Sequence, residues 1–168
     1  MMVSHPTTGI LHVSTSILID APITKVWSTL LDFKSYPQWN PFRHQQVIIS
    51  PETKEPLTSQ NLSEGSVVLT EVHMPPSMQT GSGQQRTVEC IVLDPINYRQ
   101  AWTSTDFPRW LLYPVRWDIL TTEGGMTKYE SFESVNGILA YFLYYFMQDS
   151  LQLAHNEMAK ALKNRVEL

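Results

Sequence analysis

The chain closes on residues 136–168, NGILAYFLYYFMQDSLQLAHNEMAKALKNRVEL, which hold no proline and no glycine after Gly137. A stretch of this length without a breaking residue predicts a single helix of roughly eight turns. Lys160, Lys163 and Arg165 lie near its C-terminus, where cations complement the helix dipole. The rest of the chain must therefore provide a surface on which one long helix can lie.

One stripe of this helix is apolar apart from a phenol and an imidazole. At about 100° per residue its members fall within about 80° of one another and share a face. They are Ala140, Tyr144, Met147, Leu151, His155, Met158 and Leu162. The opposite face is polar in the second half but carries Phe142 and Phe146 in the first. The first half is thus apolar nearly all round, and we expect it to be covered on both sides.

Length and composition place the chain among globular proteins and exclude several partners. A chain of 168 residues with 42% apolar and 17% charged residues fits one domain with a sizeable core. The net charge of −4 argues against a nucleic-acid partner, which requires a basic patch. No apolar run reaches the roughly 18 residues that a membrane span requires, so we expect no stable membrane insertion.

The N-terminus and the single cysteine indicate where the protein works. Residues 1–9 hold no Lys, no Arg and no apolar run, so we expect a flexible lead-in rather than a secretory signal. Residues 10–168 then form a single domain, because no repeat or linker divides them. Cys90 cannot form an intrachain disulfide, which favours a reducing, cytoplasmic location.

The residues before the long helix predict one short helix and about seven strands. Pro22 suits the first turn of a helix, and apolar residues follow it at helical spacing. Alternating apolar and polar residues predict strands over residues 12–21, 47–50, 66–74, 86–94, 98–104, 115–122 and 126–135. The clearest hairpin turns at Glu123-Gly-Gly125, and hairpins imply an antiparallel sheet. We therefore expect an α+β fold in which a curved sheet wraps around the last helix.

Residues 36–42, YPQWNPF, form a proline-fixed turn with three aromatic side chains. Two interpretations stay open for it. The turn is either a hydrophobic plug at the end of the short helix or the rim of a ligand site, to which Trp39, Asn40 and Phe42 would contribute.

The chain resembles the START-like superfamily of helix-grip proteins, the SRPBCC group, and within it the polyketide cyclase/dehydrase-like branch. The resemblance covers about residues 10–167 and rests on motifs in the expected order. They are Ile19-Asp-Ala-Pro22, Val26-Trp27, Tyr36-Pro-Gln-Trp-Asn-Pro-Phe42, Asp94-Pro, Gln100-Ala-Trp102, and Gly124-Gly-Met-Thr-Lys-Tyr129 leading to Asn136-Gly137. Members of this group include lipid and sterol carriers, hormone receptors and polyketide cyclases, which share a deep apolar cavity rather than a catalytic motif. The resemblance thus implies a helix-grip fold and a small hydrophobic, polyketide-like or lipid-like ligand.

The resemblance also assigns an inner face to each strand. The implied inward sets are Tyr129, Ser131, Glu133 and Val135; Val115, Trp117 and Ile119; Tyr98, Gln100 and Trp102; and Val68, Thr70, Val72 and Met74. This arrangement sends Glu71 and His73 outward. A slip of one residue inverts any set, and the register of residues 86–94 stays open.

His155 and Glu133 are the candidate catalytic residues. The ordinary pKa of histidine, near 6.5, suits proton transfer, and an inward carboxylate is costly unless it is paired. Glu133 would act as a general base toward an acidic C–H of the ligand. The alternatives are a core histidine with satisfied hydrogen bonds and a carboxylate at the solvated end of its strand. Tyr129 and Tyr144 would orient ligand carbonyls, or would simply pack.

Further ligand contacts are expected from three parts of the chain. They are Gln100, Trp102, Trp117 and Ser131 from the strands, Trp39, Asn40 and Phe42 from the turn, and Met147, Leu151 and Met158 from the long helix. The five histidines show no metal-binding spacing, and no glycine-rich phosphate loop occurs. We therefore expect no metal and no nucleotide cofactor.

Residues 106–114, DFPRWLLYP, form an apolar loop bracketed by prolines. It is expected to fold over Phe142 and Phe146. The alternatives are a homodimer contact through these two side chains and a membrane-facing lid.

Two functions follow from the sequence, and a third is possible. The first is a cyclase or dehydratase of secondary metabolism, a lyase or isomerase without cofactor, that folds a reactive polyketide in the cavity. The second is a non-catalytic carrier for a lipid or related metabolite. The third is an interaction module that uses the Phe142/Phe146 surface.

Overall fold

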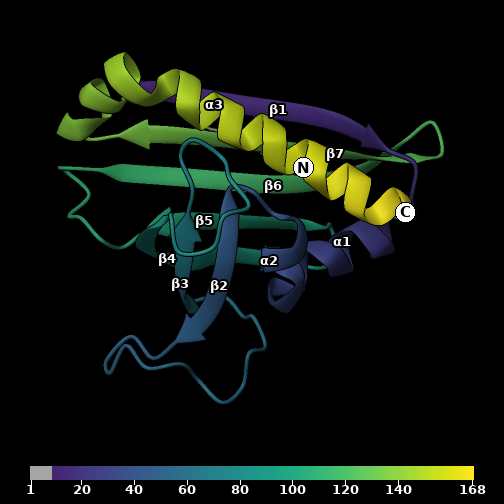
Figure 1. Cartoon of the computed structure of the whole chain (residues 1–168), viewed down its shortest axis with the longest axis horizontal. Coiled ribbons are helices and arrows are strands. Elements are labelled where there is room, and N and C mark those ends of the chain that lie inside the picture. The colour runs from purple at the N-terminus through teal and green to yellow at the C-terminus, as the bar shows by residue number, and fades with distance from the viewer. Residues whose placement is uncertain (1–8) are drawn as a thin grey trace.

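The computed structural model describes residues 9–168, so the expected lead-in lies, except for Gly9, outside the described residues. A seven-stranded antiparallel sheet curves around one long C-terminal helix, as the sequence predicted (Figure 1). The strands are β1 (Leu11–Ile19), β2 (Arg43–Ile49), β3 (Val67–Val72), β4 (Gln84–Asp94), β5 (Arg99–Ser104), β6 (Tyr113–Glu123) and β7 (Met126–Asn136). The helices are α1 (Ile23–Leu31), the 3-10 turn η1 (Phe33–Ser35), α2 (Tyr36–Trp39) and α3 (Ile138–Glu167). Among residues 9–168, no helix combines the length and the apolarity that crossing a membrane requires.

The sheet order is β1-β7-β6-β5-β4-β3-β2, so the first strand pairs with the last one in the chain. Helix α3 lies along β1, the edge strand, and covers this edge of the sheet (Figure 1). The side-chain amide of Gln152 accepts from Ser14 N at 3.3 Å and donates to Ser14 O at 2.7 Å, while Lys163 Nζ donates to Leu18 O at 2.6 Å. These contacts satisfy edge groups that would otherwise be open to pairing with another chain.

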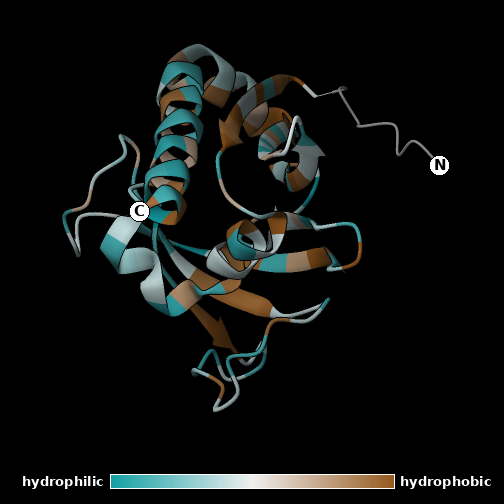
Figure 2. Cartoon of the chain, turned by 90° about the vertical axis from the view of Figure 1, so that its right-hand side faces the viewer, coloured by the Kyte–Doolittle hydropathy of each residue, from teal (hydrophilic) through white to brown (hydrophobic). Residues whose placement is uncertain are grey.

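The two halves of α3 are packed differently, and Figure 2 shows its apolar and polar faces along the helix. From residue 151 onward, the buried residues are Leu151, Ala154, His155, Met158, Ala159, Leu162 and Val166. Before residue 151 only Ala140 is buried, and Phe142 and Phe146 are 54% and 73% exposed. The expectation that the first half is covered on both sides is therefore wrong. Tyr144, predicted on the inner stripe, is 44% exposed and packs edge-on against Tyr145.

The turn of the β6–β7 hairpin fixes which side chains face the helix. Gly124 and Gly125 alone join Glu123 to Met126, and both have positive φ, as a two-residue hairpin of type I′ requires. The resulting pairs are Leu120↔Tyr129, Asp118↔Ser131 and Arg116↔Glu133.

The inner set of β6 is therefore Arg116, Asp118 and Leu120. The prediction of Val115, Trp117 and Ile119 is wrong by one residue, the slip that inverts a strand. Trp117 lies on the outer face, where its ring stacks on Phe132 with centroids 6.4 Å apart.

A register shift in β2 turns Arg43 toward the helix. Arg43 pairs with Val72 and Gln45 pairs with Glu71, so His44 is an extra residue on this strand. Such a bulge re-aims the side chains around it. Arg43 and Gln46 both become inner residues, with exposed fractions of 8% and 6%.

Glu71 lies on the outer face of β3 and His73 follows the end of the strand on the same side, as predicted, but neither is exposed. The loop of residues 77–83 covers them. Glu71 Oε1 accepts from His73 Nε2 at 2.7 Å, from Gly81 N at 2.9 Å and from Gly83 N at 3.2 Å. The hydrogen bond from His73 lowers the pKa of Glu71, so the carboxylate ties the loop to the sheet in its ionised form.

The apolar loop before β6 meets the start of α3 without covering its aromatic side chains. Ile138 N donates to Trp110 O at 3.1 Å and Leu139 N donates to Leu111 O at 2.9 Å. The loop therefore satisfies the open N–H groups of the first helical turn. Gly137, with φ of 99° and ψ of 170°, brings the two backbones together, and a Cβ on it would lie 2.6 Å from Leu111 O.

Gly137→Ala is expected to destabilise the protein by at least about 3 kcal/mol, since it combines a glycine-only conformation with a backbone clash. Gly65→Ala is the matched control, because Gly65 also has positive φ but has open space where a Cβ would lie. The control should lose only about 1–2 kcal/mol. Urea unfolding followed by tryptophan fluorescence measures both. Equal losses would show that the clash with the loop is unimportant.

Candidate functional site

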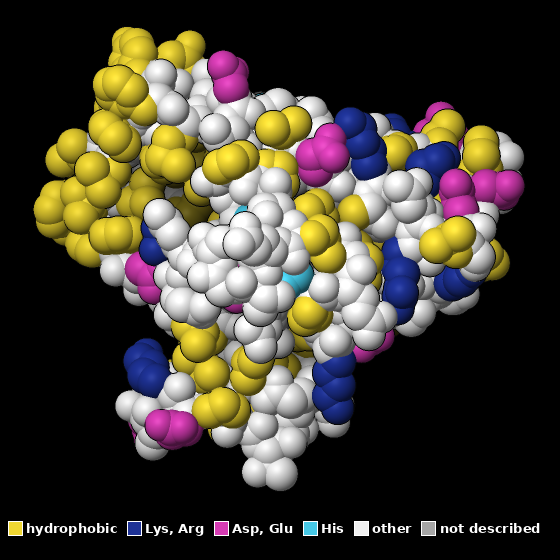
Figure 3. Space-filling model, viewed as in Figure 1, with side chains coloured by type: hydrophobic (Ala, Val, Ile, Leu, Met, Phe, Trp, Pro, Cys, Tyr) yellow, Lys and Arg dark blue, Asp and Glu magenta, His cyan; other side chains and the backbone are white. Residues whose placement is uncertain are grey.

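A cavity of about 370 Å³ lies between the inner face of the sheet and the first half of α3. Its walls are mostly apolar and include Val72, Val88, Trp102, Leu143, Met147 and Leu151. Figure 3 shows a hollow near the start of α3, bordered by hydrophobic side chains. A cavity of this size and lining suits a small, largely apolar molecule.

Polar groups meet at one side of this cavity, which we call the floor. It comprises Arg43 from β2, Thr70 from β3, Arg116 from β6 and Glu133 from β7. Arg116 and Glu133 are direct cross-strand partners, so the hairpin register places a cation and a carboxylate side by side. A ligand in the cavity therefore has apolar walls and a charged floor.

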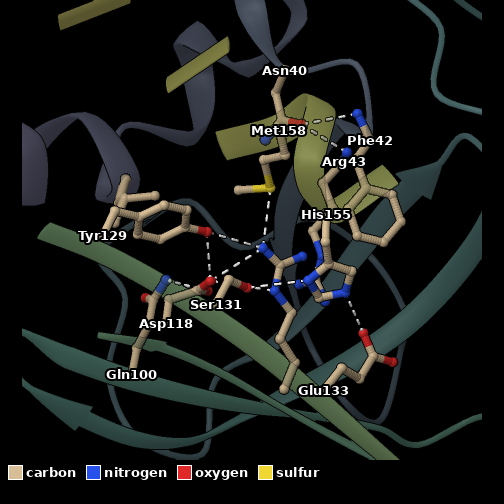
Figure 4. A network of polar contacts seen from close by, with 12 residues as sticks. Asn40, Phe42, Arg43, Gln100, Asp118, Tyr129, Ser131, Glu133, His155 and Met158 are labelled. Atoms are coloured by element: carbon tan, nitrogen blue, oxygen red, sulfur yellow. Dashed lines mark hydrogen bonds and ion pairs between the residues drawn. The ribbon is translucent and has the colours of Figure 1, made fainter. Parts of the chain in front are cut away.

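Glu133 is held at the floor by His155 from α3 (Figure 4). His155 Nε2 lies 3.0 Å from Glu133 Oε2, and its Nδ1 lies 3.2 Å from Ser131 Oγ. Burial alone raises the pKa of Glu133, but the hydrogen bond from His155 and the charges of Arg43 and Arg116 outweigh it and hold the pKa below its usual range. Glu133 is therefore ionised.

His155 is only 1% exposed and is neutral at physiological pH. Burial lowers the pKa of His155, and the positive charge of Arg116 lowers it further. A neutral imidazole next to a carboxylate carries its proton on the nitrogen that faces the carboxylate. We therefore assign a proton on Nε2, donated to Glu133.

A second network fixes Arg116 from behind the floor (Figure 4). Arg116 Nη2 lies 3.1 Å from Asp118 Oδ1, and the Tyr129 hydroxyl donates to the same oxygen at 2.8 Å. Gln100 Nε2 donates to Asp118 Oδ2 at 3.2 Å, and Met158 Sδ accepts from Arg116 Nη2 at 3.1 Å. Burial raises the pKa of Asp118, but the charges of Arg116 and Arg43 outweigh this effect and lower it. The pair is therefore ionised although it is buried.

Phe42 contacts both arginines and His155. Its ring lies 5.3 Å from the Arg116 guanidinium, 5.9 Å from that of Arg43 and 5.3 Å from the imidazole of His155. These are cation–π and aromatic contacts at a desolvated site. Asn40 Oδ1 accepts from Phe42 N at 3.0 Å and from Arg43 N at 2.9 Å, and so fixes the start of β2.

The structure divides the predicted site residues into three groups. Those that line the cavity are Phe42, Trp102, Glu133, Met147 and Leu151. Those in the polar network behind the wall are Gln100, Tyr129, Ser131, His155 and Met158. Those placed elsewhere are Trp39, Asn40, Trp117 and Tyr144.

The hydrophobic-plug interpretation fits the first part of the turn at residues 36–42. Trp39 packs against Tyr36 with ring centroids 5.0 Å apart, and its Nε1 donates to Ser35 Oγ at 3.0 Å. The Tyr36 hydroxyl donates to Leu30 O at 2.6 Å. Only Phe42 continues into the cavity, so the turn is partly plug and partly wall.

Arg43, Arg116 and Asp118 were missed by sequence reasoning. The resemblance implied Val115, Trp117 and Ile119 as the inner set, which placed Arg116 and Asp118 on the outer face. The bulge that turns Arg43 inward has no clear signal in the sequence. A signal did exist for β6. Once Tyr129 is inward, a two-residue turn at Gly124 and Gly125 forces Leu120, Asp118 and Arg116 inward as well.

Within residues 9–168, no group of three His, Cys, Asp or Glu side chains is arranged to hold a metal ion. The floor itself presents one carboxylate, one hydroxyl and two guanidinium groups.

Comparisons with known proteins agree on the fold. The family described as polyketide cyclase/dehydrase and lipid transport matches residues 11–167. A curated protein of Penicillium oxalicum, called oxopyrrolidines biosynthesis cluster protein O, is 27% identical over 173 residues, covering 90% of this chain and 84% of its own.

Solved structures resemble the chain over nearly its whole length. A hypothetical protein of Helicobacter pylori superposes with a TM-score of 0.74 at 14% identity, covering 96% of this chain and 90% of its own. An aromatase/cyclase of Streptomyces sp. R1128 gives 0.66 at 15% identity and 93% coverage of both chains. A START superfamily protein of Mycobacterium smegmatis gives 0.61 at 19% identity, with 93% and 97% coverage. At these identities the likeness shows the fold alone.

Breaking the Arg116–Asp118 pair should be costly. Asp118→Asn leaves a buried guanidinium without its carboxylate and is expected to lower the free energy of unfolding by about 3–5 kcal/mol. The double variant Arg116→Met/Asp118→Leu should lose less than the sum of the single variants Arg116→Met and Asp118→Leu, because no uncompensated charge remains. Urea unfolding of all four variants tests this, and strict additivity would contradict a direct interaction.

The buried His155 should make stability fall in mild acid. Its folded-state pKa is below the unfolded value of about 6.5, so the unfolded chain binds a proton first as pH decreases. Its contribution is therefore complete above about pH 6.5 and decreases below that value. His155→Gln keeps a donor for Glu133 and should flatten the dependence of unfolding free energy on pH between 5 and 7. An unchanged slope would show that His155 is not held neutral.

Proposed function

The chain belongs to the polyketide cyclase/dehydrase and lipid transport family, and we propose that it is an enzyme of this family that cyclises or dehydrates a small, largely apolar ketone. The observation that carries the proposal is the ionised Glu133 carboxylate, held by a neutral His155 at the charged floor of an apolar cavity. The similarity to a biosynthesis cluster protein supports a place in secondary metabolism.

The proposed reaction is an aldol-type cyclisation that begins with proton transfer to Glu133. The carboxylate removes a proton from a carbon next to a ligand carbonyl, and the electron pair moves to that carbonyl oxygen as an enolate. The enolate carbon then attacks a second carbonyl of the same molecule and forms the ring bond. Glu133 returns its proton to the new alkoxide, and elimination of that hydroxyl with a neighbouring hydrogen releases water.

His155 acts as a positioning residue, because it lies behind Glu133 and does not line the cavity. Its Nε2–H fixes one carboxylate oxygen and leaves the other for the ligand. The Ser131 hydroxyl lies 3.2 Å from the other ring nitrogen, Nδ1. The apolar walls hold the flexible chain in a folded conformation, which reduces the entropic cost of ring closure.

A non-catalytic carrier is the second candidate. Aromatic side chains of α3 that remain exposed, including Phe142 and Phe146, favour it because they lie on the half of the helix that borders the cavity. A carrier needs no charged floor, however, and two buried arginines and a carboxylate would weaken rather than strengthen the binding of a simple lipid.

Glu133→Gln should abolish ring closure while leaving binding intact. The probe is an aryl-substituted 1,5-diketone, whose cyclisation and loss of water give a cyclohexenone that liquid chromatography with mass detection resolves. The wild-type rate should exceed the buffer rate, and Glu133→Gln should lower it by about 100- to 10,000-fold. Binding, followed by quenching of tryptophan fluorescence, should change little, because glutamine has a similar size and shape.

Glu130→Gln is the matched control, because Glu130 lies on the same strand but is paired with Lys128 on the outer face. It should keep the wild-type rate. If the wild-type protein binds a series of such diketones without accelerating their cyclisation, the carrier interpretation replaces the enzyme. If Glu133→Gln keeps the full rate, Glu133 is not the base.

A further inference from the structure

The outer side of the first turns of α3 carries a stripe of large apolar side chains, which we call the outer stripe. It consists of Ile138, Tyr141, Phe142, Tyr145 and Phe146, which are 54–76% exposed. At about 100° per residue these positions lie within roughly 140° of one another, on the side of the helix opposite the buried Ala140. Their spacing is that of a helix face that packs against another element. Within residues 9–168, no element buries this face.

The loop before β6 extends this apolar surface. Ile138 N donates to Trp110 O at 3.1 Å, so the loop backbone lies beside the first turn of the helix. Trp110 is 66% exposed, and Phe107, which lines the cavity together with Leu143, is 38% exposed. Figure 3 shows hydrophobic side chains gathered around the hollow near the start of α3. We call the outer stripe together with Trp110 and Phe107 the aromatic patch.

The aromatic patch is larger than the apolar surface that a monomeric protein usually exposes. At roughly 150–250 Å² for each aromatic side chain, the exposed fractions amount to about 800 Å². The largest apolar patch on a typical monomer covers about 300–600 Å². A specific, stable interface buries about 800 Å² on each of the two proteins. The patch alone therefore provides the area that a stable dimer needs.

The side chains of the patch are held in place before any partner arrives. The rings of Phe142 and Phe146 pack with centroids 4.8 Å apart, and Tyr145 packs edge-on against the neighbouring Tyr144 with centroids 5.3 Å apart. Two loop carbonyls accept from the first N–H groups of the helix and fix its direction. Contact with a partner therefore costs little additional conformational entropy.

The charges near the patch favour a second copy of this chain over a membrane surface. Residues 137–148 contain no Asp, Glu, Lys, Arg or His, so two copies of the outer stripe can meet without like charges. Helices that lie on membranes are rich in Lys and Arg on their polar face, whereas the first charged residue of α3 is Asp149 and its first Lys or Arg is Lys160. The loop adds one cation, Arg109, and one anion, Asp106, which balance. The patch is therefore complementary to itself.

We propose that the aromatic patch is the contact surface of a homodimer with twofold symmetry. Such a contact uses the same surface on both subunits, and the core of a protein interface is enriched in aromatic and depleted of charged side chains. Asp149 follows Tyr145 by four residues and lies on the same side of the helix, so a parallel pair of helices would bring two carboxylates together. An antiparallel pair that crosses near Phe142, the middle of the stripe, keeps them about 20 Å apart. The two copies of α3 therefore run antiparallel. This inference does not depend on the reaction proposed above.

Sedimentation velocity over a wide range of protein concentration tests the dimer. The wild-type chain should reach twice the monomer mass of 19.3 kDa. Phe146→Glu should raise the dissociation constant at least about 100-fold, because each dimer would then bury two unpaired carboxylates. Ile96→Glu is the matched control, because Ile96 is 86% exposed but lies in the turn before β5, at the other end of the sheet from the start of α3. It should leave the dissociation constant unchanged within about threefold.

Disulfide cross-linking tests the orientation of the two helices. Cys90 is the one cysteine of the chain and is buried, so a cysteine introduced on the stripe reacts alone. Phe142→Cys should form a disulfide-linked dimer under mild oxidation, because the two copies of this position lie beside the twofold axis. Asp149→Cys should not, since its two copies lie about 20 Å apart. Linkage through Asp149→Cys but not through Phe142→Cys would overturn the antiparallel pair.

Three other results would overturn the homodimer itself. A wild-type chain that stays monomeric at every concentration shows that the patch does not bind its own copy. A dimer whose dissociation constant ignores Phe146→Glu places the contact elsewhere. A monomer that floats with phosphatidylcholine vesicles, and no longer does so as Phe146→Glu, assigns the patch to a membrane surface instead.

Discussion

The buried ion pair between Arg116 and Asp118 is the interaction on which the rest of the site depends. It joins β6 to β7 through Tyr129, to β5 through Gln100 and to α3 through Met158. Two charges can remain away from water here because both Asp118 oxygens are hydrogen-bonded and the geometry is close. The pair fixes the side chain of Arg116, a residue that lines the cavity. Its contribution is therefore to position the site at least as much as to stabilise the fold.

The same pair marks the boundary between what the sequence could and could not predict. The strands, the hairpins and the long helix were predictable because turns, alternation and an apolar stripe all indicated one fold. Arg116 and Asp118 were assigned outward because the family resemblance was taken to place Val115, Trp117 and Ile119 inward. The two-glycine turn at Gly124 and Gly125 held the correct register, but the assignment did not use it. A buried charged pair is the kind of local exception that is found at functional sites.

The inward position of Arg43 was harder to predict from the sequence than the position of the ion pair. Its inward direction depends on an extra residue in β2, and nothing in the local sequence distinguishes a bulge from regular pairing there. The prediction that Tyr144 faces the cavity was wrong for a different reason. The helical stripe was correct in angle, but the sheet supports only the second half of α3, so the first half keeps exposed aromatic side chains. The helix is anchored at one end, while its other end forms a wall of the cavity.

The arginines of the floor have two opposing effects on proton transfer. Their charges lower the pKa of Glu133 and therefore make it a weaker base. The same charges stabilise an enolate, and they do so more strongly if its oxygen contacts a guanidinium, whereas Glu133 lies more than 4.0 Å from both. Since the interaction of charges grows as distance falls, an enolate oxygen that lies closer to a guanidinium than Glu133 does would gain more from these charges than the base loses. In the proposed reaction, an apolar cavity with this floor therefore favours the state in which the proton has moved from the ligand carbon to Glu133 and the negative charge lies on the ligand oxygen.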